Sequence, residues 1–185
     1  MTKTTIRFGT DGWRAVMGQE YTPENVERVT LATHLALLGH AKAAGGIAIG
    51  YDTRRDSAVY ARQAADILAQ HGWTVYLADA VVPTPGVSLR VRERGCAAGI
   101  VITASHNPAE FNGFKLKSEA GGPAGAALIA AVEKQIDQPC TPKEGGKVVV
   151  EDFIKPYLKH VAHFVDMSRI RSSGVRLAHH AMHGA

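Results

Sequence analysis

Short apolar runs rich in β-branched residues alternate along the chain with longer segments of helical periodicity. This alternation is typical of α/β folds, in which helices connect the strands of a largely parallel sheet. Strands are expected at 47–51, 74–77, 99–103 and 148–150, and helices near 22–44, 57–71, 84–95 and 124–137. The sequence therefore predicts an α/β fold in three layers, α/β/α, around a mixed sheet.

The strand expected at 114–117 is what makes the sheet mixed. It begins too few residues after the 99–103 strand for a crossover helix to fit between them, so the two should pair antiparallel. The sheet is therefore expected to be mostly parallel with one antiparallel strand. Further extended segments are expected at 5–8 and 175–178.

Capping residues mark the ends of the expected helices. Thr22 is suited to the N-cap of the first helix and Pro23 to its first helical position. Gly45 and Gly46 are expected to end that helix, and Gly95 is expected to end the third.

The 185 residues suffice for one substantial domain with a little left over. We expect that domain at residues 1–150, and a linker helix with the start of a truncated second domain at 151–185. Neither a membrane-spanning apolar run nor a secretory signal occurs, so we expect a cytoplasmic protein with no membrane partner. The two cysteines have no motif spacing and are expected to be inert thiols.

The formal net charge of +4 raises the question of nucleic-acid binding. The basic residues are scattered, however, and the densest group, Arg90, Arg92 and Arg94, is expected on one solvated helix face. A basic pocket for phosphorylated metabolites explains a mild excess of positive charge equally well. We therefore expect no nucleic-acid partner.

Three polar loops follow expected strands, at 9–14, 52–55 and 104–108. In an open α/β sheet, ligands bind at the carboxyl ends of the parallel strands. The loop side chains include Ser, His, Asn and Arg, which suit a phosphorylated ligand. Asp11 and Asp52 are interpreted as turn residues that accept backbone hydrogen bonds rather than as metal ligands. Arg54 is expected to pair with a neighbouring carboxylate or with the sheet edge.

Ser105 is the central residue of the third loop. A serine hydroxyl is a weak nucleophile, and a phosphoryl group on it would carry about −2 charge. Arg14, Lys115 and His106 are cations or donors able to neutralise that charge, and Asn107 lies just before a proline that favours a fixed turn. Taken on spacing alone, however, a polar turn that caps the sheet edge is the better interpretation. A serine hydrolase is a third hypothesis, but its Gly-x-Ser-x-Gly elbow is absent.

The segment Gly99–Lys117 contains Thr-Ala-Ser-His-Asn-Pro followed, at a fixed offset, by Asn-Gly-Phe-Lys, and it resembles the phosphoserine signature of the α-D-phosphohexomutases. Phe8–Arg14, reading Phe-Gly-Thr-Asp-Gly-Trp-Arg, resembles the N-terminal loop of that family. Gly50–Arg54 resembles its second strand and loop, and the resemblance runs in all from Ile6 to about Pro123. Trp13 favours the bacterial phosphoglucomutase/phosphomannomutase branch, since phosphoglucosamine mutases usually carry isoleucine there.

The resemblance implies a phosphohexomutase that interconverts the 1- and 6-phosphates of glucose and/or mannose through a bisphosphate intermediate. In that interpretation Ser105 carries the transferable phosphoryl group, and Lys115 is the general acid/base. His106 orients the sugar and its phosphate, Arg14 contacts the phosphoserine, and Asn107 holds the turn. The family also implies Mg²⁺, which the phosphate on Ser105 would help to bind, and a hexose 1,6-bisphosphate activator.

Several family patterns are missing from the 185 residues. The magnesium loop Asp-Gly-Asp-x-Asp-Arg does not occur, nor do the sugar-reading and phosphate-binding loops. Met182–Ala185 resembles the opening of the family's second domain. We therefore expect an N-terminal part that is inactive alone and whose exposed domain interface would allow self-association. The alternatives are a phosphoglucosamine mutase fragment and a non-catalytic phosphate-binding module that keeps the fold.

Overall fold

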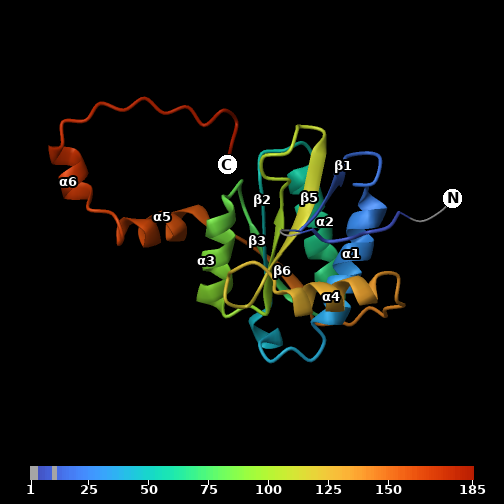
Figure 1. Cartoon of the computed structure of the whole chain (residues 1–185). Helices are drawn as coiled ribbons and strands as arrows, with labels where there is room; N and C mark the ends of the chain where they lie inside the picture. The colour runs from blue at the N-terminus through green and yellow to red at the C-terminus, as the bar shows by residue number, and fades with distance from the viewer. Residues whose placement is uncertain (1–3, 10–11) are drawn as a thin grey trace.

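The computed structural model describes residues 4–9 and 12–185, and the strands among them form one six-stranded sheet (Figure 1). The strand order across the sheet is β1-β5-β4-β2-β3-β6. The strands are β1 (Trp13–Val16), β2 (Ile47–Tyr51), β3 (Thr74–Ala78), β4 (Ala98–Ile102), β5 (Phe111–Lys117) and β6 (Lys147–Glu151).

The sheet is mixed, as the sequence predicts. Strands β4, β2, β3 and β6 are parallel to one another, whereas β5 is antiparallel to both of its neighbours, β4 and β1. Strand β5 is therefore the only one of these six that runs opposite to the rest. The prediction of a mostly parallel sheet with one antiparallel strand is confirmed.

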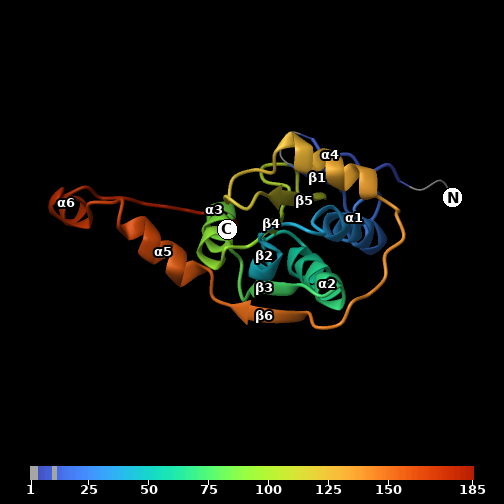
Figure 2. The same cartoon turned by 90° about the horizontal axis from the view of Figure 1, so that it is seen from below.

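Helices cover both faces of the sheet, which gives the predicted three layers (Figure 2). Helices α1, α2 and α4 pack together on one face, and α3 lies on the other against β2 and β4. Helix α5 contacts α3, and α6 follows it. The helices are α1 (Pro23–Ala36), α2 (Ser57–Gln70), α3 (Thr84–Arg94), α4 (Ala126–Gln135), α5 (Ile154–Ala162) and α6 (Met167–Ser172).

Two apolar clusters fill the space between the layers. The larger one, between the sheet and α1, α2 and α4, includes Ile49, Ile100 and Phe114, each fully buried. The smaller one lies under α3, which approaches the sheet closely at Gly50. A Cβ atom at Gly50 would lie only 2.4 Å from Val87 of α3, so a side chain there would push that helix away from β2.

The predicted caps of α1 and α3 are confirmed, and one predicted helix end is wrong. The Thr22 hydroxyl oxygen accepts a hydrogen bond from the backbone N–H of Asn25 at 3.3 Å, which satisfies a free donor of the first turn. Gly95 ends α3 in the left-handed conformation. Helix α1, however, stops at Ala36, and only a short 3₁₀ turn at Ala43–Gly45 precedes β2.

The first strand differs from the sequence prediction. Residues 5–8 lie outside the sheet ladder, whereas Trp13–Val16, expected in part as a loop, forms β1. This edge strand alternates buried and half-buried residues over only four positions. Its pairing with β5, about a hundred residues later in the chain, is not visible in the local pattern.

The expectation of a solvated arginine face on α3 is wrong for Arg90, whereas Arg92 and Arg94 are exposed as predicted. Arg90 is buried, donates to the backbone oxygen of Asp152 at 2.7 Å and pairs with Glu151 at 3.2 Å. Arg94 also pairs with Glu151, and its guanidinium lies over the ring of Tyr76. These arginines fasten β6 and the start of α5 to α3.

The C-terminal segment leaves the α/β body along α5 and α6 and returns toward it at its end (Figure 1). The strand predicted at 175–178 is absent, and Val175 and Leu177 are 66% and 85% exposed. Leu158 and Phe164 are exposed as well, so apolar surface is available on this segment. Self-association through it stays a prediction, as does the domain boundary near 150. Among the described residues, no helix has the length and apolar character needed to cross a bilayer.

His34 on α1 is a buried, neutral histidine. Its Nδ1 accepts a hydrogen bond from the Trp73 indole at 2.9 Å, a role that a doubly protonated ring cannot fill. Burial, together with the nearby His71 and Lys143, lowers the pKa of His34 from 6.5 to about 4.

This geometry predicts a loss of stability in mild acid. The unfolded chain binds a proton at His34 near pH 6.5 and the folded chain does not, so the stabilisation is present above pH 6.5 and is lost as the pH falls toward 4. Between pH 7 and 5.5 we expect the free energy of unfolding to fall about 1 kcal/mol more in the wild type than in His34→Gln. Urea unfolding at the two pH values measures this, and equal pH dependence of the two proteins would contradict it.

Candidate functional site

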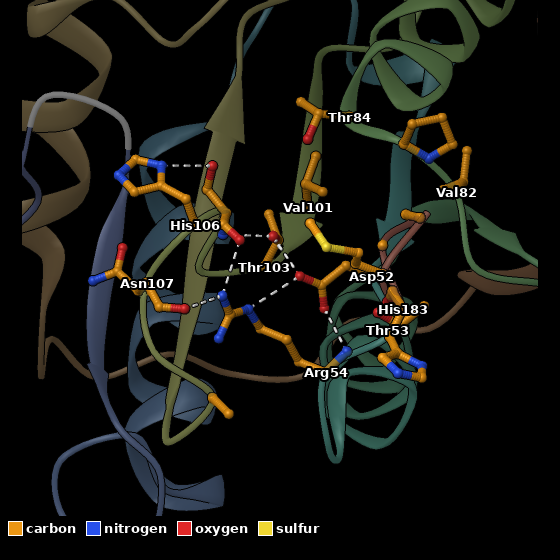
Figure 3. Close-up of a pocket in the computed structure, with 16 residues that line it drawn as sticks. Asp52, Thr53, Arg54, Val82, Thr84, Val101, Thr103, His106, Asn107 and His183 are labelled. Carbon is orange, nitrogen blue, oxygen red and sulfur yellow. Dashed lines mark hydrogen bonds and ion pairs between the residues drawn. The ribbon is translucent and has the colours of Figure 1, made fainter. Parts of the chain in front are cut away.

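The candidate site is a cavity of about 570 Å³ at the carboxyl ends of β2 and β4. Its position is the one that the parallel strands predict for a ligand site. The loop after β2 and the loop from β4 to β5 form two walls, and Figure 3 shows their side chains facing one another. Residues 82–84 before and at the start of α3 and residues 182–185 complete the lining. The Thr53 hydroxyl donates a hydrogen bond to the backbone oxygen of His183.

Ser105 has an uncommon backbone conformation in this wall. Its φ of 58° lies in the left-handed region, where a side chain with a Cβ atom is disfavoured. The Ser105 N–H donates to the Thr103 hydroxyl at 2.9 Å, and that hydroxyl donates to Asp52 Oδ2 at 2.6 Å. The loop therefore holds Ser105 in a strained conformation through hydrogen bonds, as is common where a side chain must be presented at a functional site.

The Ser105 hydroxyl lies next to a histidine. Its Oγ is 3.4 Å from Nδ1 of His106, and both residues line the cavity (Figure 3). A hydroxyl and an imidazole nitrogen at this separation can share a proton weakly. The structure places both predicted site residues in one cavity, and their assignment to a catalytic site stays a prediction.

Arg14 and Lys115 lie on the same face of the sheet. Arg14 of β1 stands opposite Gly113 of β5, and Lys115 is two residues further along β5. Directly opposed residues and alternate residues of a strand share a face. Lys115 is also opposite Val101, which lines the cavity, so this face is the one on which the cavity lies.

Arg14 of β1 reaches the serine loop, which is residues 103–110 between β4 and β5. Its Nη1 donates to Oδ1 of Asn107 at 2.6 Å, two residues after Ser105. Gly113 leaves room for this path, because a Cβ atom there would lie 3.0 Å from the Arg14 side chain. Lys115 is only 5% exposed, so its side chain is held inside the protein.

Arg54 is the functional-site residue whose importance the sequence analysis underestimated. Its Nη1 donates to the backbone oxygens of Pro108 and Phe111 at 2.8 and 2.9 Å. Its Nη2 donates to those of Ser105 and Asn107 at 2.9 and 2.6 Å. The expected carboxylate partner is also present, since Nε of Arg54 lies 3.4 Å from Asp52.

Asp52 acts as the turn residue that the sequence predicts. Its Oδ1 accepts from the backbone N–H of Arg54 at 3.0 Å and from the Ser57 hydroxyl at 2.8 Å. Asp11, interpreted in the same way, lies outside the described residues. Within residues 4–9 and 12–185, no group of three His, Cys, Asp or Glu side chains could hold a metal ion.

Comparison with known proteins places this geometry in a family context. The family model "Phosphoglucomutase/phosphomannomutase, alpha/beta/alpha domain I" matches residues 5–142. A probable phosphoribomutase of Schizosaccharomyces pombe is 36% identical over 80% of this chain and 26% of its own length. A phosphoglucosamine mutase of Solibacter usitatus is 34% identical over 96% of this chain and 40% of its own length.

Solved structures agree on the fold. A putative phosphomannomutase from Thermus thermophilus has a TM-score of 0.81 and 32% identity, covering 91% of this chain and 38% of that protein. A Paramecium phosphoglucomutase, parafusin, has a TM-score of 0.70 at 18% identity, which supports the fold alone; the match covers 92% of this chain and 37% of that protein. The chain thus spans about a quarter to two fifths of the length of these relatives.

The strained backbone at Ser105 generates a stability prediction. Replacing Ser105 by glycine removes the Cβ atom that disfavours the left-handed conformation, so we expect unfolding to cost about 1 kcal/mol more. Ser105→Ala keeps the Cβ atom and serves as the matched control, with a change within about 0.5 kcal/mol. Urea unfolding at pH 7.5 compares the three proteins. A glycine variant no more stable than the alanine variant would show that the backbone is not strained.

Proposed function

The chain belongs to the phosphoglucomutase/phosphomannomutase family, and on that premise we propose that it supplies the phosphoserine of a phosphohexomutase. The reaction interconverts hexose 1-phosphates and hexose 6-phosphates, and the proposed site of phosphorylation is Ser105. The observation that carries the proposal is the strained, hydrogen-bonded presentation of Ser105 at the strand ends. The cationic side chains of Arg14 and Lys115 on the same sheet face support it.

Phosphoryl transfer in this proposal begins with phosphate on Ser105. The bond between phosphorus and the serine oxygen breaks, and phosphorus bonds to a hydroxyl oxygen of the hexose monophosphate. Lys115 accepts the proton of that hydroxyl and passes it to the departing Ser105 oxygen, so the products are a hexose bisphosphate and a free serine hydroxyl. The bisphosphate then turns around, and the phosphorus of its other phosphate bonds to the Ser105 oxygen while its bond to the hexose oxygen breaks. Lys115 carries the serine proton to that hexose oxygen, which regenerates the phosphoserine and releases the isomeric hexose monophosphate.

The protein contributes chiefly positioning and charge neutralisation to such a transfer. Arg14 is fixed beside the loop through Asn107, and its guanidinium suits phosphate oxygens. His106, 3.4 Å from the serine oxygen, orients the incoming sugar phosphate. The described residues do not form the carboxylate cluster that Mg²⁺ requires, so these residues alone do not fit that ion.

The identity of the sugar is the finer part of the proposal. Trp13 favours glucose or mannose phosphates by the family resemblance, and we propose these as substrates. The alternative is glucosamine phosphate, which is supported by phosphoglucosamine mutases at 34% identity to this chain. We also propose a cytoplasmic location and a hexose 1,6-bisphosphate that primes Ser105.

A ³¹P NMR titration of the chain produced with phosphoserine at position 105 tests the proposal. Free phosphoserine loses its second proton near pH 6. Nearby cations favour the dianion, so we expect the pKa of the bound phosphate to fall below that value, and to rise toward it again in Arg14→Gln. A wild-type phosphate that titrates like the free amino acid would contradict the proposed site.

A coupled assay for conversion of glucose 1-phosphate tests what the 185 residues do alone. We expect turnover at least about 100-fold below that of a full-length relative, because the sugar-reading pattern of the family does not occur in the sequence and the described residues form no metal-holding group. Turnover within tenfold of a full-length relative would contradict this expectation. A Ser105→Ala variant controls for contaminating mutase activity.

A further inference from the structure

One backbone polar group of Ser105 bonds directly to Arg54, and the other is linked to Asp52, the ion-pair partner of Arg54, through the Thr103 hydroxyl. The Ser105 N–H donates to Thr103, whose hydroxyl is held by Asp52, and the Ser105 carbonyl oxygen accepts from Arg54. Asp52 and Arg54 belong to the loop after β2, whereas Ser105 follows the neighbouring strand β4. The conformation of the serine loop is therefore set from outside that loop.

Arg54 spans the whole serine loop. Besides Ser105, it donates to the carbonyl oxygens of Asn107, Pro108 and Phe111, so it contacts the loop from the serine to the first residue of β5. Figure 3 shows its guanidinium between Asp52 and Asn107. A lysine at this position has a point-like ammonium group and cannot form the same planar set of bonds.

Arg54 uses its N–H donors on protein oxygen atoms rather than on a phosphate ligand. A guanidinium has five N–H donors, and here Nη1 and Nη2 each serve two carbonyls while Nε faces Asp52. All the N–H groups of Arg54 are thus directed at oxygen atoms of the protein. The Asp52 carboxylate balances its charge, so the pair acts on Ser105 through geometry rather than through added positive charge.

We propose that Arg54 is a positioning residue for phosphoryl transfer, with Asp52 as its anchor. The pair keeps Ser105 in the left-handed conformation that points its oxygen at the cavity before any phosphate is attached. The role of Arg54 in phosphoryl transfer rests on the proposed function. Its structural part, the clamp on residues 105–111, is measurable in the unmodified chain.

Arg54→Lys tests the clamp while keeping the charge, and Arg62→Lys is the matched control. Arg62 lies on α2, is exposed and pairs with Asp66, four residues later on the same helix. In the unphosphorylated chain we expect amide hydrogen exchange at residues 105–111 to become about tenfold faster in Arg54→Lys and to stay unchanged in Arg62→Lys. Unchanged exchange of the loop in Arg54→Lys would overturn the inference.

The phosphoserine form supplies a readout that general loosening of the fold would not move. In Arg54→Lys we expect the ³¹P titration midpoint to shift back toward that of free phosphoserine, although no charge is lost. Melting temperatures of the two lysine variants control for global destabilisation. An unshifted midpoint in Arg54→Lys would overturn the positioning role. If instead the wild-type midpoint itself matches free phosphoserine, the proposed function fails, and the exchange data still decide whether the clamp exists.

Discussion

The ion pair between Asp52 and Arg54 is the interaction on which the site depends. Both residues follow β2, and their hydrogen bonds to Ser105 and Thr103 connect the end of that strand to the end of the neighbouring parallel strand β4. An exposed ion pair contributes little to stability, but this one is mostly shielded and makes hydrogen bonds in several directions. The ion pair therefore acts by fixing the backbone path of the serine loop, which contains the strained residue Ser105.

The sheet topology brings the remaining groups to that loop. Because β5 returns antiparallel beside β4, Lys115 lies next to the strand that carries the serine loop. Strand β1 then adds Arg14 on the far side of β5, where Gly113 leaves space for its side chain. The close approach of α3 at Gly50 brings the start of that helix to the other side of the cavity.

Much of the fold follows from local sequence, and the predictions that were wrong or incomplete concern contacts between distant parts of the chain. The run 47–51 is buried throughout most of its length, and Thr22 caps its helix within three residues, so both were predictable. The burial of Arg90 was not predicted, and the role of Arg54 in the site was underestimated. In both cases a hydrogen-bond partner lies more than fifty residues away in the sequence. The acceptors of Arg54 are backbone carbonyls, which have no side-chain signature in a sequence. Residues 175–178 carry a strand-like pattern but pair with no strand in the part of the chain that the structure describes.

The central claim is that Ser105 holds a phosphate among cations on one sheet face. A crystal structure of the chain with phosphoserine at position 105 tests it most directly. We expect phosphate oxygens within about 4 Å of the Arg14 guanidinium and the Lys115 amine, with the loop backbone unchanged. A phosphate directed into solvent, with neither side chain within that distance, would contradict it.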